Sequence, residues 1–489
     1  MDTTISTLGE RRIESPLRLR SMGDELVGDF VTDAARIRLS VEVGSTPETV
    51  FEKAGPREMI YFDPARTRAA IVTCGGLCPG LNTVIRSVFL ELFHNYGVKE
   101  VLGIRYGYQG LNSAVAQPPM RLTPEIVEDI HMEGGTVLGS SRGDQPVPVM
   151  VDFLVQNKIN ILFCVGGDGT QRGAHAIVEE VRKRGLPIAV VGIPKTIDND
   201  IMYVRSTFGF VTAVDRAREV LFCAHSEAHS YPNGIGLVRL MGRDSGFITA
   251  MASLASHEVN FTLIPEVPFK LEGERGFLNV LKNRILARNH ALIAVAEGAG
   301  QDLLAGGAAT KDASGNVLHK DIGLFLKDRI AEYFKGEGIP INLKYIDPSY
   351  IIRSVPANSE DSLLCDQYAR NAVHAAMAGK TDMIIGLWHA FMHVPIAMAT
   401  SARRRVSRES LLWHSVISST GQPARFEWWV HPGAFDRPFK ESEAIGGAVT
   451  GDYEIDHQAV SLARCRSPYV PGLHAQAAAA RAAGGPGDR

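Results

Sequence analysis

The sequence lacks the features that would carry it into a membrane or out of the cell. No apolar run approaches the roughly 18 residues needed to span a bilayer, and residues 1–20 are charged, without the apolar core of a signal peptide. Cysteine is scarce, and the six residues at 74, 78, 164, 223, 365 and 465 show neither paired spacing nor a cluster that would complete a zinc site. We therefore expect a cytoplasmic protein with reduced cysteines and without a membrane partner.

The sequence also lacks an excess of either charge. It has 51 lysines and arginines against 54 aspartates and glutamates, so its net charge of −3 gives no reason to expect nucleic acid as a partner. A negatively charged ligand must therefore be bound by basic residues that are gathered locally. The 489 residues are too many for one hydrophobic core, which indicates two domains.

Two apolar segments that each end in a polar loop are the strongest signal in the chain. Residues 159–165 lead into Gly-Gly-Asp-Gly-Thr at 166–170, and residues 187–193 lead into Pro-Lys-Thr-Ile-Asp-Asn-Asp at 194–200. Apolar residues at helical spacing between them predict a helix over 171–184. The pattern indicates a strand, helix and strand unit of a parallel sheet, in which ligands bind at the carboxyl ends of the strands.

The first of these loops combines groups that attract anions with a carboxylate. Gly166, Gly167 and Gly169 let the backbone approach a ligand, and the amides that open the following helix attract phosphate. Asp168 stands among these amides, and Mg2+ would reconcile it with a phosphate because this ion takes oxygens from both. For Gly-Gly-Asp-Gly taken alone, a simple tight turn is the alternative.

The second loop carries two carboxylates that are two residues apart. An extended backbone would point Asp198 and Asp200 the same way, while Asn199 would face elsewhere. This arrangement suits one general base and one carboxylate that serves the metal. Asp-Asn-Asp alone is more often a solvated loop, but two such loops in one unit favour a functional site.

The same order of strand, loop and helix continues along the chain. We expect further strands over 69–73, 101–106, 234–240, 259–264, 291–296 and 383–388, and further helices ending near 96 and over 123–131, 247–256 and 361–377. Thr170 and Gly185 are expected to be the N-cap and the left-handed stop of the 171–184 helix. Arg142 closes a Gly/Ser-rich loop and suits phosphate oxygens, although a surface arginine is the commoner case.

These elements predict an α/β fold with two doubly wound domains and parallel-type sheets. We expect an N-terminal extension over 1–66, a first domain over 67–205 and a second over 206–400, with some segments of the second returning to the first. Residues 401–489 are expected to form a C-terminal extension that ends in a flexible tail.

Six motifs, in one order, resemble those of the 6-phosphofructokinases over about residues 67–390. They are Cys74-Gly-Gly-Leu-Cys-Pro-Gly80, the 166–170 loop, the 194–200 loop, Met241-Gly-Arg243, Glu297-Gly298 and Tyr350-Ile-Ile-Arg353. The resemblance implies phosphoryl transfer from ATP, with Mg2+, to the 1-hydroxyl of fructose 6-phosphate, in a site between the two domains. It also implies a homo-oligomer, either a tetramer or a dimer.

The resemblance implies a role for each matching residue. Asp198 would take the proton of the hydroxyl group, and Arg243 would be the second catalytic residue. The donor would be held by Gly75, Arg142, Gly143, Gly167, Asp168, Gly169, Thr170 and Lys195, with Asp168 acting through the metal. Fructose 6-phosphate would be held by Thr196, Ile197, Asp198, Met241, Gly242, Arg243, Glu297, Lys344, Tyr350 and Arg353.

The sequence departs from the common bacterial pattern of this family. Lys344 stands where those enzymes have an arginine, Tyr350 where they have a histidine, and Gly234 where a neighbouring subunit's arginine is expected. Gly169 resembles the ATP-using enzymes, whereas Lys195 is frequent in the pyrophosphate-using ones. Together with the long N-terminal extension, the pair is most similar to the ATP-dependent branch of plants and trypanosomatids.

Three alternatives stay open. One is a pyrophosphate-dependent enzyme of the same family. A dinucleotide-binding oxidoreductase would need a glycine spacing that Gly167, Gly169 and Gly173 miss by one residue. A catalytically silent regulatory subunit would be expected to have lost Asp168 or Asp198, and both are present.

Overall fold

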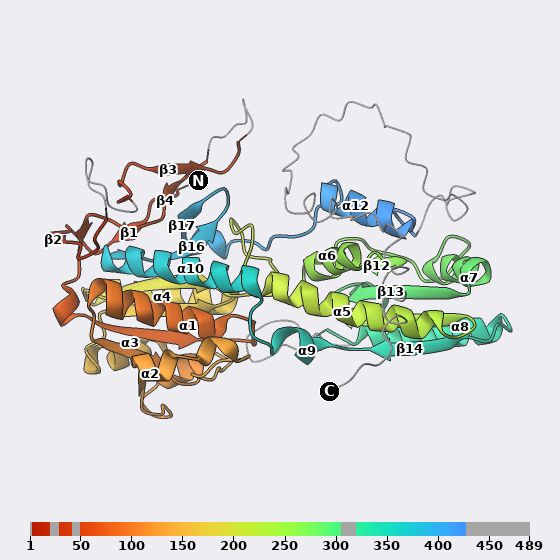
Figure 1. Ribbon diagram of the computed structural model, residues 1–489, viewed down its shortest axis with the longest axis horizontal. Helices are drawn as coiled ribbons and strands as arrows, with labels where there is room; N and C mark the ends of the chain where they lie inside the picture. Colours follow the sequence, from red (N-terminus) through yellow and green to blue (C-terminus); the bar gives the residue numbers. More distant parts are fainter. Residues whose placement is uncertain (1, 20–28, 42–48, 305–318, 427–489) are drawn as a thin grey trace, which may run out of the picture. The chain divides into compact units, whose positions relative to one another are not determined.

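The computed structural model describes residues 2–19, 29–41, 49–304 and 319–426 (Figure 1). All of them belong to one compact unit that extends from Met1 to Ser442. The flexible tail predicted for the end of the chain and Cys465 lie outside the described residues. The five cysteines in the described part are free thiols, and only Cys223 among them is exposed. The domain boundaries stay predictions.

The larger sheet has a parallel centre and antiparallel edges. Its order is β3-β4-β17-β16-β10-β9-β6-β7-β8, and the strands from β16 to β7 run parallel. The strands are β3 (Arg36–Arg38), β4 (Val50–Lys53), β17 (Phe391–Pro395), β16 (Met383–Leu387), β10 (Ala189–Pro194), β9 (Ile161–Gly166), β6 (Arg68–Thr73), β7 (Glu100–Ile104) and β8 (Met120–Arg121). Every residue of β9 and β10 is buried, as expected for strands covered on both faces.

Helices cover both faces of this sheet. α1 (Leu81–Leu90) packs against α10 (Ser359–Met377), and α4 (Asp168–Lys183) packs against α3 (Val147–Gln156) (Figure 1). The steps from β6 to β7 and from β9 to β10 run in opposite directions across the sheet. Right-handed crossovers therefore place α1 and α4 on opposite faces, which is the doubly wound arrangement that the sequence predicts.

The smaller sheet is parallel throughout, in the order β12-β13-β11-β14. Its strands are β12 (Phe261–Leu263), β13 (His290–Ala296), β11 (Gly234–Leu240) and β14 (Asn342–Ile346). It is contacted by α5 (Phe210–His229), α6 (Phe247–Ser256), α7 (Phe277–Arg288) and α8 (Ile322–Gly336). The chain then returns through α10 to β16 in the larger sheet.

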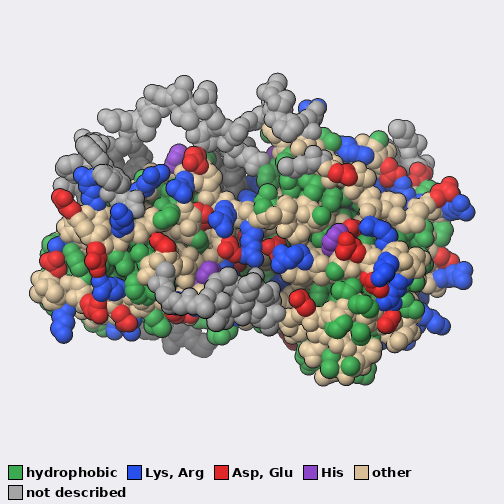
Figure 2. Space-filling view, turned by 180° about the vertical axis from the view of Figure 1, so that it is seen from behind, with side chains coloured by type: hydrophobic (Ala, Val, Ile, Leu, Met, Phe, Trp, Pro, Cys, Tyr) green, Lys and Arg blue, Asp and Glu red, His purple; other side chains and the backbone are tan. Residues whose placement is uncertain are grey.

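The remaining elements are short. β1 (Ser6–Thr7) pairs with β15 (Lys380–Thr381), and β2 (Ile13–Glu14) pairs with β5 (Met59–Ile60). The other helical segments are α2 (Pro124–Val127), α9 (Ser349–Arg353), α11 (Ile396–Ala399), α12 (Leu411–Thr420), a π-helical segment (Glu91–Tyr96), and 3-10 turns at Pro64–Arg66, Gly107–Leu111, Ile130–Met132 and Gln301–Leu304. Over the described ranges, no helix has both the length and the apolar character that a membrane crossing needs. Positive and negative side chains are interspersed over the face shown in Figure 2.

Two predicted helix details are wrong. Thr170 is not an N-cap, because α4 already begins at Asp168 with Gly167 as its cap residue. An aspartate in the first turn is favoured by the helix dipole, so the helix extends into the glycine loop. The helix predicted over 123–131 is interrupted after Val127 and resumes as a 3-10 turn, although Thr123 does accept a hydrogen bond from the Ile126 amide. The left-handed stop at Gly185 is confirmed by its φ of 61°.

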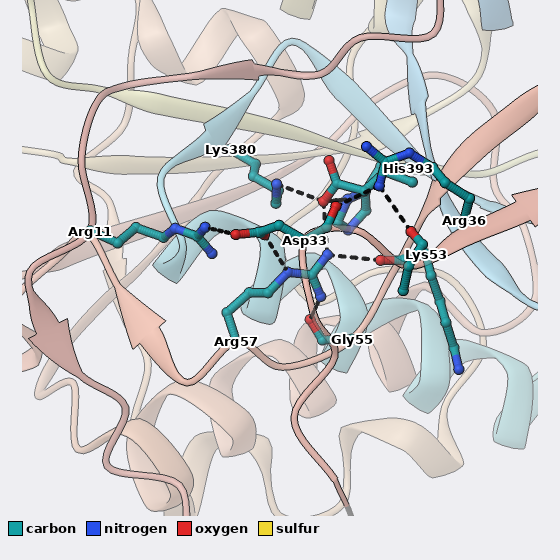
Figure 3. Close-up of polar contacts among 10 residues, drawn as sticks. Arg11, Asp33, Arg36, Lys53, Gly55, Arg57, Lys380 and His393 are labelled. Carbon is teal, nitrogen blue, oxygen red and sulfur yellow. Dashed lines mark hydrogen bonds and ion pairs between the residues drawn. The ribbon is translucent and has the colours of Figure 1, made fainter. Parts of the chain in front are cut away.

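The N-terminal segment adds β3 and β4 to the larger sheet through a buried ion-pair network (Figure 3). Glu52 Oε1 accepts hydrogen bonds from Arg57 Nη2 at 2.7 Å and from His393 Nδ1 at 3.2 Å. Lys380 Nζ lies 2.6 Å from the same oxygen. Arg57 is only 2% exposed, and its Nε also donates to Asp33 Oδ1 at 3.2 Å. One carboxylate therefore joins β4 to β15 and β17, which are more than 300 residues away in the sequence.

The Glu52→Gln variant should be less stable than the wild type by about 3 kcal/mol at neutral pH, because Lys380 would lose the carboxylate that pairs with its buried charge and Arg57 would be left with the half-exposed Asp33. Although burial opposes it, hydrogen bonds from His393 and Lys380 and the charge of Lys380 lower the pKa of Glu52 far below its ordinary value. The stability that the ionised Glu52 side chain contributes is therefore present above the ordinary pKa of glutamate and is lost as the pH falls below that value. Chemical denaturation of the wild type and the variant, from neutral pH to below the ordinary pKa of glutamate, measures both the loss of stability and its dependence on pH.

Glu10→Gln is the matched control, because Glu10 pairs with Arg12 in the same N-terminal segment while both side chains are more than 70% exposed. Its effect should stay within about 0.5 kcal/mol. Equal losses of stability in the two variants would contradict the anchoring role of Glu52.

Candidate active site

Loops from both sheets meet in one pocket. β6, β9 and β10 of the larger sheet and β11 and β13 of the smaller sheet all contribute residues at or just beyond their carboxyl ends. Of the predicted site residues, the pocket is lined by Gly75, Arg142, Gly143, Gly167, Asp168, Gly169, Thr170, Lys195, Thr196, Ile197, Asp198, Met241, Arg243, Glu297 and Arg353. This edge of a parallel sheet is where ligands bind in such folds.

The glycine loop after β6 lies beneath several cations. Gly75 has a φ of 85°, which favours glycine, and its carbonyl accepts a hydrogen bond from Ser140 Oγ at 2.6 Å. Lys195 is 6% exposed, and its Nζ donates to the Gly76 carbonyl at 2.6 Å. A Cβ at Gly76 would lie 3.5 Å from Arg142 Nη2 and 3.8 Å from an Arg353 nitrogen. The loop therefore places open backbone beside three positive groups.

The start of α4 forms the second part of the pocket. Gly167 precedes the helix, and the amides of its first turn have no partner within the helix. Asp168 is the first helical residue, with its side chain 13% exposed, and Arg403 Nε donates to its Oδ2 at 3.1 Å. Burial raises the pKa of Asp168, whereas the charges of Arg403 and Arg172 lower it. The helix end suits an anion, and the carboxylate beside it requires a cation.

The loop after β10 places two carboxylates in the pocket by a different conformation from the one expected. Asn199 has a φ of 53°, so the backbone is not extended there. Its side chain is held away from the pocket, because Oδ1 accepts from the Thr207 amide at 3.0 Å and Nδ2 donates to the Arg205 carbonyl at 3.1 Å. Asp198 and Asp200 both line the pocket. Both carboxylates therefore line the pocket, with a left-handed residue between them that the loop fixes in place.

Asp198 is a buried carboxyl group with an unsatisfied oxygen. Its Oδ1 is buried and accepts no hydrogen bond from any described residue. Burial raises the pKa of Asp198 well above its ordinary value, and the charges of Asp200 and Glu297 raise it further, against Arg243 and Arg403. A group with these properties in a pocket is suited to accept a proton during a reaction.

The far side of the pocket is formed by charged residues of the smaller sheet. Arg243 Nε lies 3.8 Å from Glu297 Oε1, and Arg239 Nη1 lies 3.5 Å from Glu297 Oε2. Arg353, at the end of α9, also lines the pocket, and its Nε is buried with no hydrogen-bond partner in the described part of the chain. An unsatisfied guanidinium donor in a pocket favours an anionic ligand.

Three predicted site residues do not line the pocket. Lys344 lies on β14, with its Nζ 3.9 Å from Glu227 and its side chain half exposed. Tyr350 is 75% exposed. Gly242 lies between two lining residues but turns away, and its carbonyl accepts from the Gly298 amide at 3.1 Å. The roles of these residues stay predictions.

The structure also brings in residues that the sequence analysis did not propose. They are Cys74, Gly76, Leu77, Tyr108, Ser141, Asp144 and Arg403. Tyr108 donates a hydrogen bond from its hydroxyl to the Thr170 carbonyl at 2.6 Å, which supports the first turn of α4. The motif Gly107-Tyr-Gln-Gly110 was a visible signal for Tyr108, whereas no local pattern distinguishes Arg403 from the neighbouring Arg404 and Arg405.

The chain is similar to known phosphofructokinases. Residues 68–376 match the model of the phosphofructokinase family. Over 435 residues the chain is 51% identical to the ATP-dependent 6-phosphofructokinase of Borreliella burgdorferi, a match that covers 86% of this chain and 97% of that protein. The ATP-dependent 6-phosphofructokinase of Trypanosoma cruzi is 48% identical over 373 residues, or 76% of each chain.

A solved structure agrees in fold. The pyrophosphate-dependent phosphofructokinase of Marinobacter aquaeolei matches with a TM-score of 0.60 over 80% of this chain and 100% of that chain. The two sequences are 17% identical, so this likeness concerns the fold alone.

Asp198→Asn should raise the thermal stability of the protein. Because the folded state raises the pKa of Asp198, its ionisation opposes folding at every pH above the ordinary value, and a neutral side chain of equal shape removes that cost. We expect the unfolding midpoint to rise by roughly 1–3 °C at neutral pH. Scanning calorimetry with a chelator and without ligands measures this shift.

The exposed Asp129, replaced by asparagine, is the control and should leave the midpoint unchanged. The gain for Asp198→Asn should shrink as the pH falls below the ordinary pKa of aspartate, since the carboxyl group is then neutral in both the folded and the unfolded state. A lower midpoint at neutral pH would contradict the electrostatic account of this residue.

Proposed function

Because the chain belongs to the phosphofructokinase family, we propose that it transfers the terminal phosphoryl group of ATP to the 1-hydroxyl of fructose 6-phosphate, giving fructose 1,6-bisphosphate and ADP. One observation carries this proposal. The buried Asp198 carboxyl group lies in the same pocket as an anion-binding helix end on one side and the paired Arg243 and Glu297 on the other. The pocket therefore offers a proton acceptor between a phosphate site and a polar acceptor site.

The donor side is proposed to bind the phosphates of ATP. The amides at the start of α4 and the backbone amide of Gly76 donate hydrogen bonds to phosphate oxygens, with Gly75, Gly143 and Thr170 beside them. Arg142 contributes a planar fork that can bridge two oxygens. Lys195 places a charge close to the glycine loop, although burial lowers its pKa.

The residues of the pocket are compatible with Mg2+. Asp168, Asp198 and Asp200 lie close together: burial raises the pKa of Asp198 and Asp200, and the charge of Asp168 raises that of Asp200 further, as the charge of Asp200 does for Asp198. The described residues contain no group of three or more histidine, cysteine or acidic side chains placed to hold a metal by themselves. Mg2+ commonly uses one or two carboxylates plus phosphate oxygens, so we propose Asp168 as its protein ligand. When bound, the ion would neutralise charge on the phosphates.

The acceptor side is proposed to hold the sugar and to move one proton. Asp198 takes the proton from the 1-hydroxyl as its oxygen forms the bond to phosphorus and the bond to ADP breaks. Arg243 stabilises the negative charge of the transferred group. The sugar is held by Thr196, Ile197, Met241, Glu297 and Arg353.

Pyrophosphate is the alternative phosphoryl donor, and the residue at position 169 distinguishes a site for pyrophosphate from a site for ATP. A Cβ added at Gly169 would meet no atom within 4 Å, and the residue lines the pocket. That open space can accept the inner phosphate of a nucleotide, and the relatives that resemble this chain at 44–51% identity are named as ATP-dependent enzymes. We therefore propose ATP. The cytoplasmic location and the homo-oligomer stay predictions.

Asp198→Asn should lower kcat with fructose 6-phosphate and ATP by roughly 100-fold or more, because asparagine keeps the shape but cannot take the proton. KM for the sugar should change little. A coupled assay of purified protein, run with either ATP or pyrophosphate, measures this and tests the proposed reaction directly. If the variant retains more than about half of the wild-type kcat, Asp198 is not the base.

Gly169→Asp should abolish most ATP turnover while leaving the fold intact. The new carboxylate would project into open space inside the pocket and repel the phosphates of the donor, which should reduce kcat/KM for ATP by roughly 100-fold. Gly336→Asp in α8 is the matched control, because a Cβ there also meets no atom within 4 Å but lies outside the pocket. A wild-type enzyme with a higher kcat/KM for pyrophosphate than for ATP would refute the choice of donor.

A further inference from the structure

Arg403 lies where the two halves of the pocket meet, although it comes from outside the matched family region. Its Nε donates to Asp168 Oδ2 at 3.1 Å, and its Nη1 forms an ion pair with Asp244. Asp168 opens the helix on the donor side, whereas Asp244 follows Arg243 in the loop after β11. The family match ends at residue 376. One guanidinium from the following segment therefore bridges the donor loop and the acceptor loop.

The segment that carries Arg403 is held in place independently of that side chain. The Arg404 amide donates to the Asp200 carbonyl at 2.8 Å, and Arg404 Nη1 donates to the Arg205 carbonyl at 2.7 Å. The Arg404 guanidinium also lies 4.7 Å from the centre of the Phe247 ring. Two residues further on, the Val406 amide donates to Glu266 Oε1 at 2.8 Å. Arg403 is therefore delivered to the pocket by contacts that do not need its own charge.

The placement of Arg403 fits a phosphate ligand better than a structural ion pair. Its side chain is 28% exposed and lines the pocket, so its donors are accessible to a bound molecule. Because Asp244 holds Nη1, Nε can pass from Asp168 to a phosphate oxygen without the guanidinium leaving the pocket. The planar fork of arginine suits two oxygens of one phosphoryl group.

We propose that Arg403 is a catalytic residue that binds the phosphoryl group in transfer, and that Asp244 is the positioning residue that keeps its guanidinium in the pocket. This inference rests on the phosphoryl transfer proposed above. The group passes from the helix end at Asp168 toward Arg243, and Arg403 spans that path. A cation fixed at this place stabilises charge in the transition state without having to be reorganised.

Three substitutions of Arg403 test the proposal. Arg403→Gln should lower kcat by about 100-fold while KM for fructose 6-phosphate changes less than about threefold, as expected for a lost transition-state contact. Arg403→Lys should recover part of the loss, because it restores charge but not the fork. The activity of Arg403→Ala should rise when guanidinium ions are added, since they can occupy the site of the missing group. Asp244→Asn should lower kcat in the same direction but less.

Two neighbouring arginines provide controls. Arg405→Gln should keep wild-type kcat, because Arg405 is exposed and does not line the pocket. Arg404→Gln should lower the thermal midpoint clearly more than Arg403→Gln does. A kcat for Arg403→Gln within about threefold of wild type, or a loss of thermal stability equal to that of Arg404→Gln, would overturn the proposal.

Calorimetric titration with Mg-ATP and with fructose 6-phosphate separates this proposal from the proposed reaction. Arg403→Gln should bind Mg-ATP more weakly and the sugar with unchanged affinity. If the wild type binds both ligands but turns over neither, the proposed reaction is wrong. The Mg-ATP affinities of the wild type and of Arg403→Gln would still show whether Arg403 contacts the donor. Equal Mg-ATP affinities, with equal kcat where turnover is seen, would exclude that contact.

Discussion

The balance of buried charge in the pocket is the constraint on which the rest of the site depends. Five carboxylates and five cations line one pocket, and burial raises the pKa of Asp168, Asp198 and Asp200. The charge of Arg403 lowers the pKa of all three aspartates and so opposes the effect of burial. Without cations supplied from other parts of the chain, these acids would take up protons and lose the charge that a metal or a proton transfer requires. The site therefore cannot be assembled from the acidic loops alone.

The path of the chain supplies the missing cations. It first forms the pocket loops that follow β6, β9 and β10, crosses through α5 to the smaller sheet for Arg243, and then contributes Arg353 from α9. It returns through α10 to β16 and β17, after which residue 403 reaches the pocket. Each crossing between the sheets adds residues between the groups that meet in the pocket, and the entropy cost of bringing these groups together rises with that number. The site is therefore stable only if both sheets are firmly packed. The two sheets provide this through extensive apolar cores, to which strands such as β6, β9, β10, β11 and β13 contribute mostly buried residues.

The edge of the larger sheet shows the same dependence on remote partners. Glu52 on β4 is satisfied by Lys380 on β15 and His393 on β17, so the N-terminal segment completes a sheet whose last strands come from the other end of the chain. His393 is fully buried, and burial lowers its pKa to about 4, which keeps its ring neutral beside two cations. The N-terminal sequence did not reveal these strands, because they are only three and four residues long and the partners of Glu52 lie near residues 380 and 393.

Local sequence determined the parts of this protein whose physics is local. Strands such as β9 and β10 are continuous apolar runs, and the loops with glycine and aspartate that follow them lie at the carboxyl edge of a parallel sheet, where ligands bind in such folds. For that reason, most predicted strands and most of the pocket could be located without coordinates. Tertiary structure alone decided that α5 joins the two sheets, that Asn199 turns left-handed, and that Tyr350 and Lys344 stay outside the pocket. It also decided that Arg403 meets Asp168 across 235 residues. These outcomes depend on which distant groups satisfy a buried charge or hydrogen bond, and no local pattern of residue types records that choice.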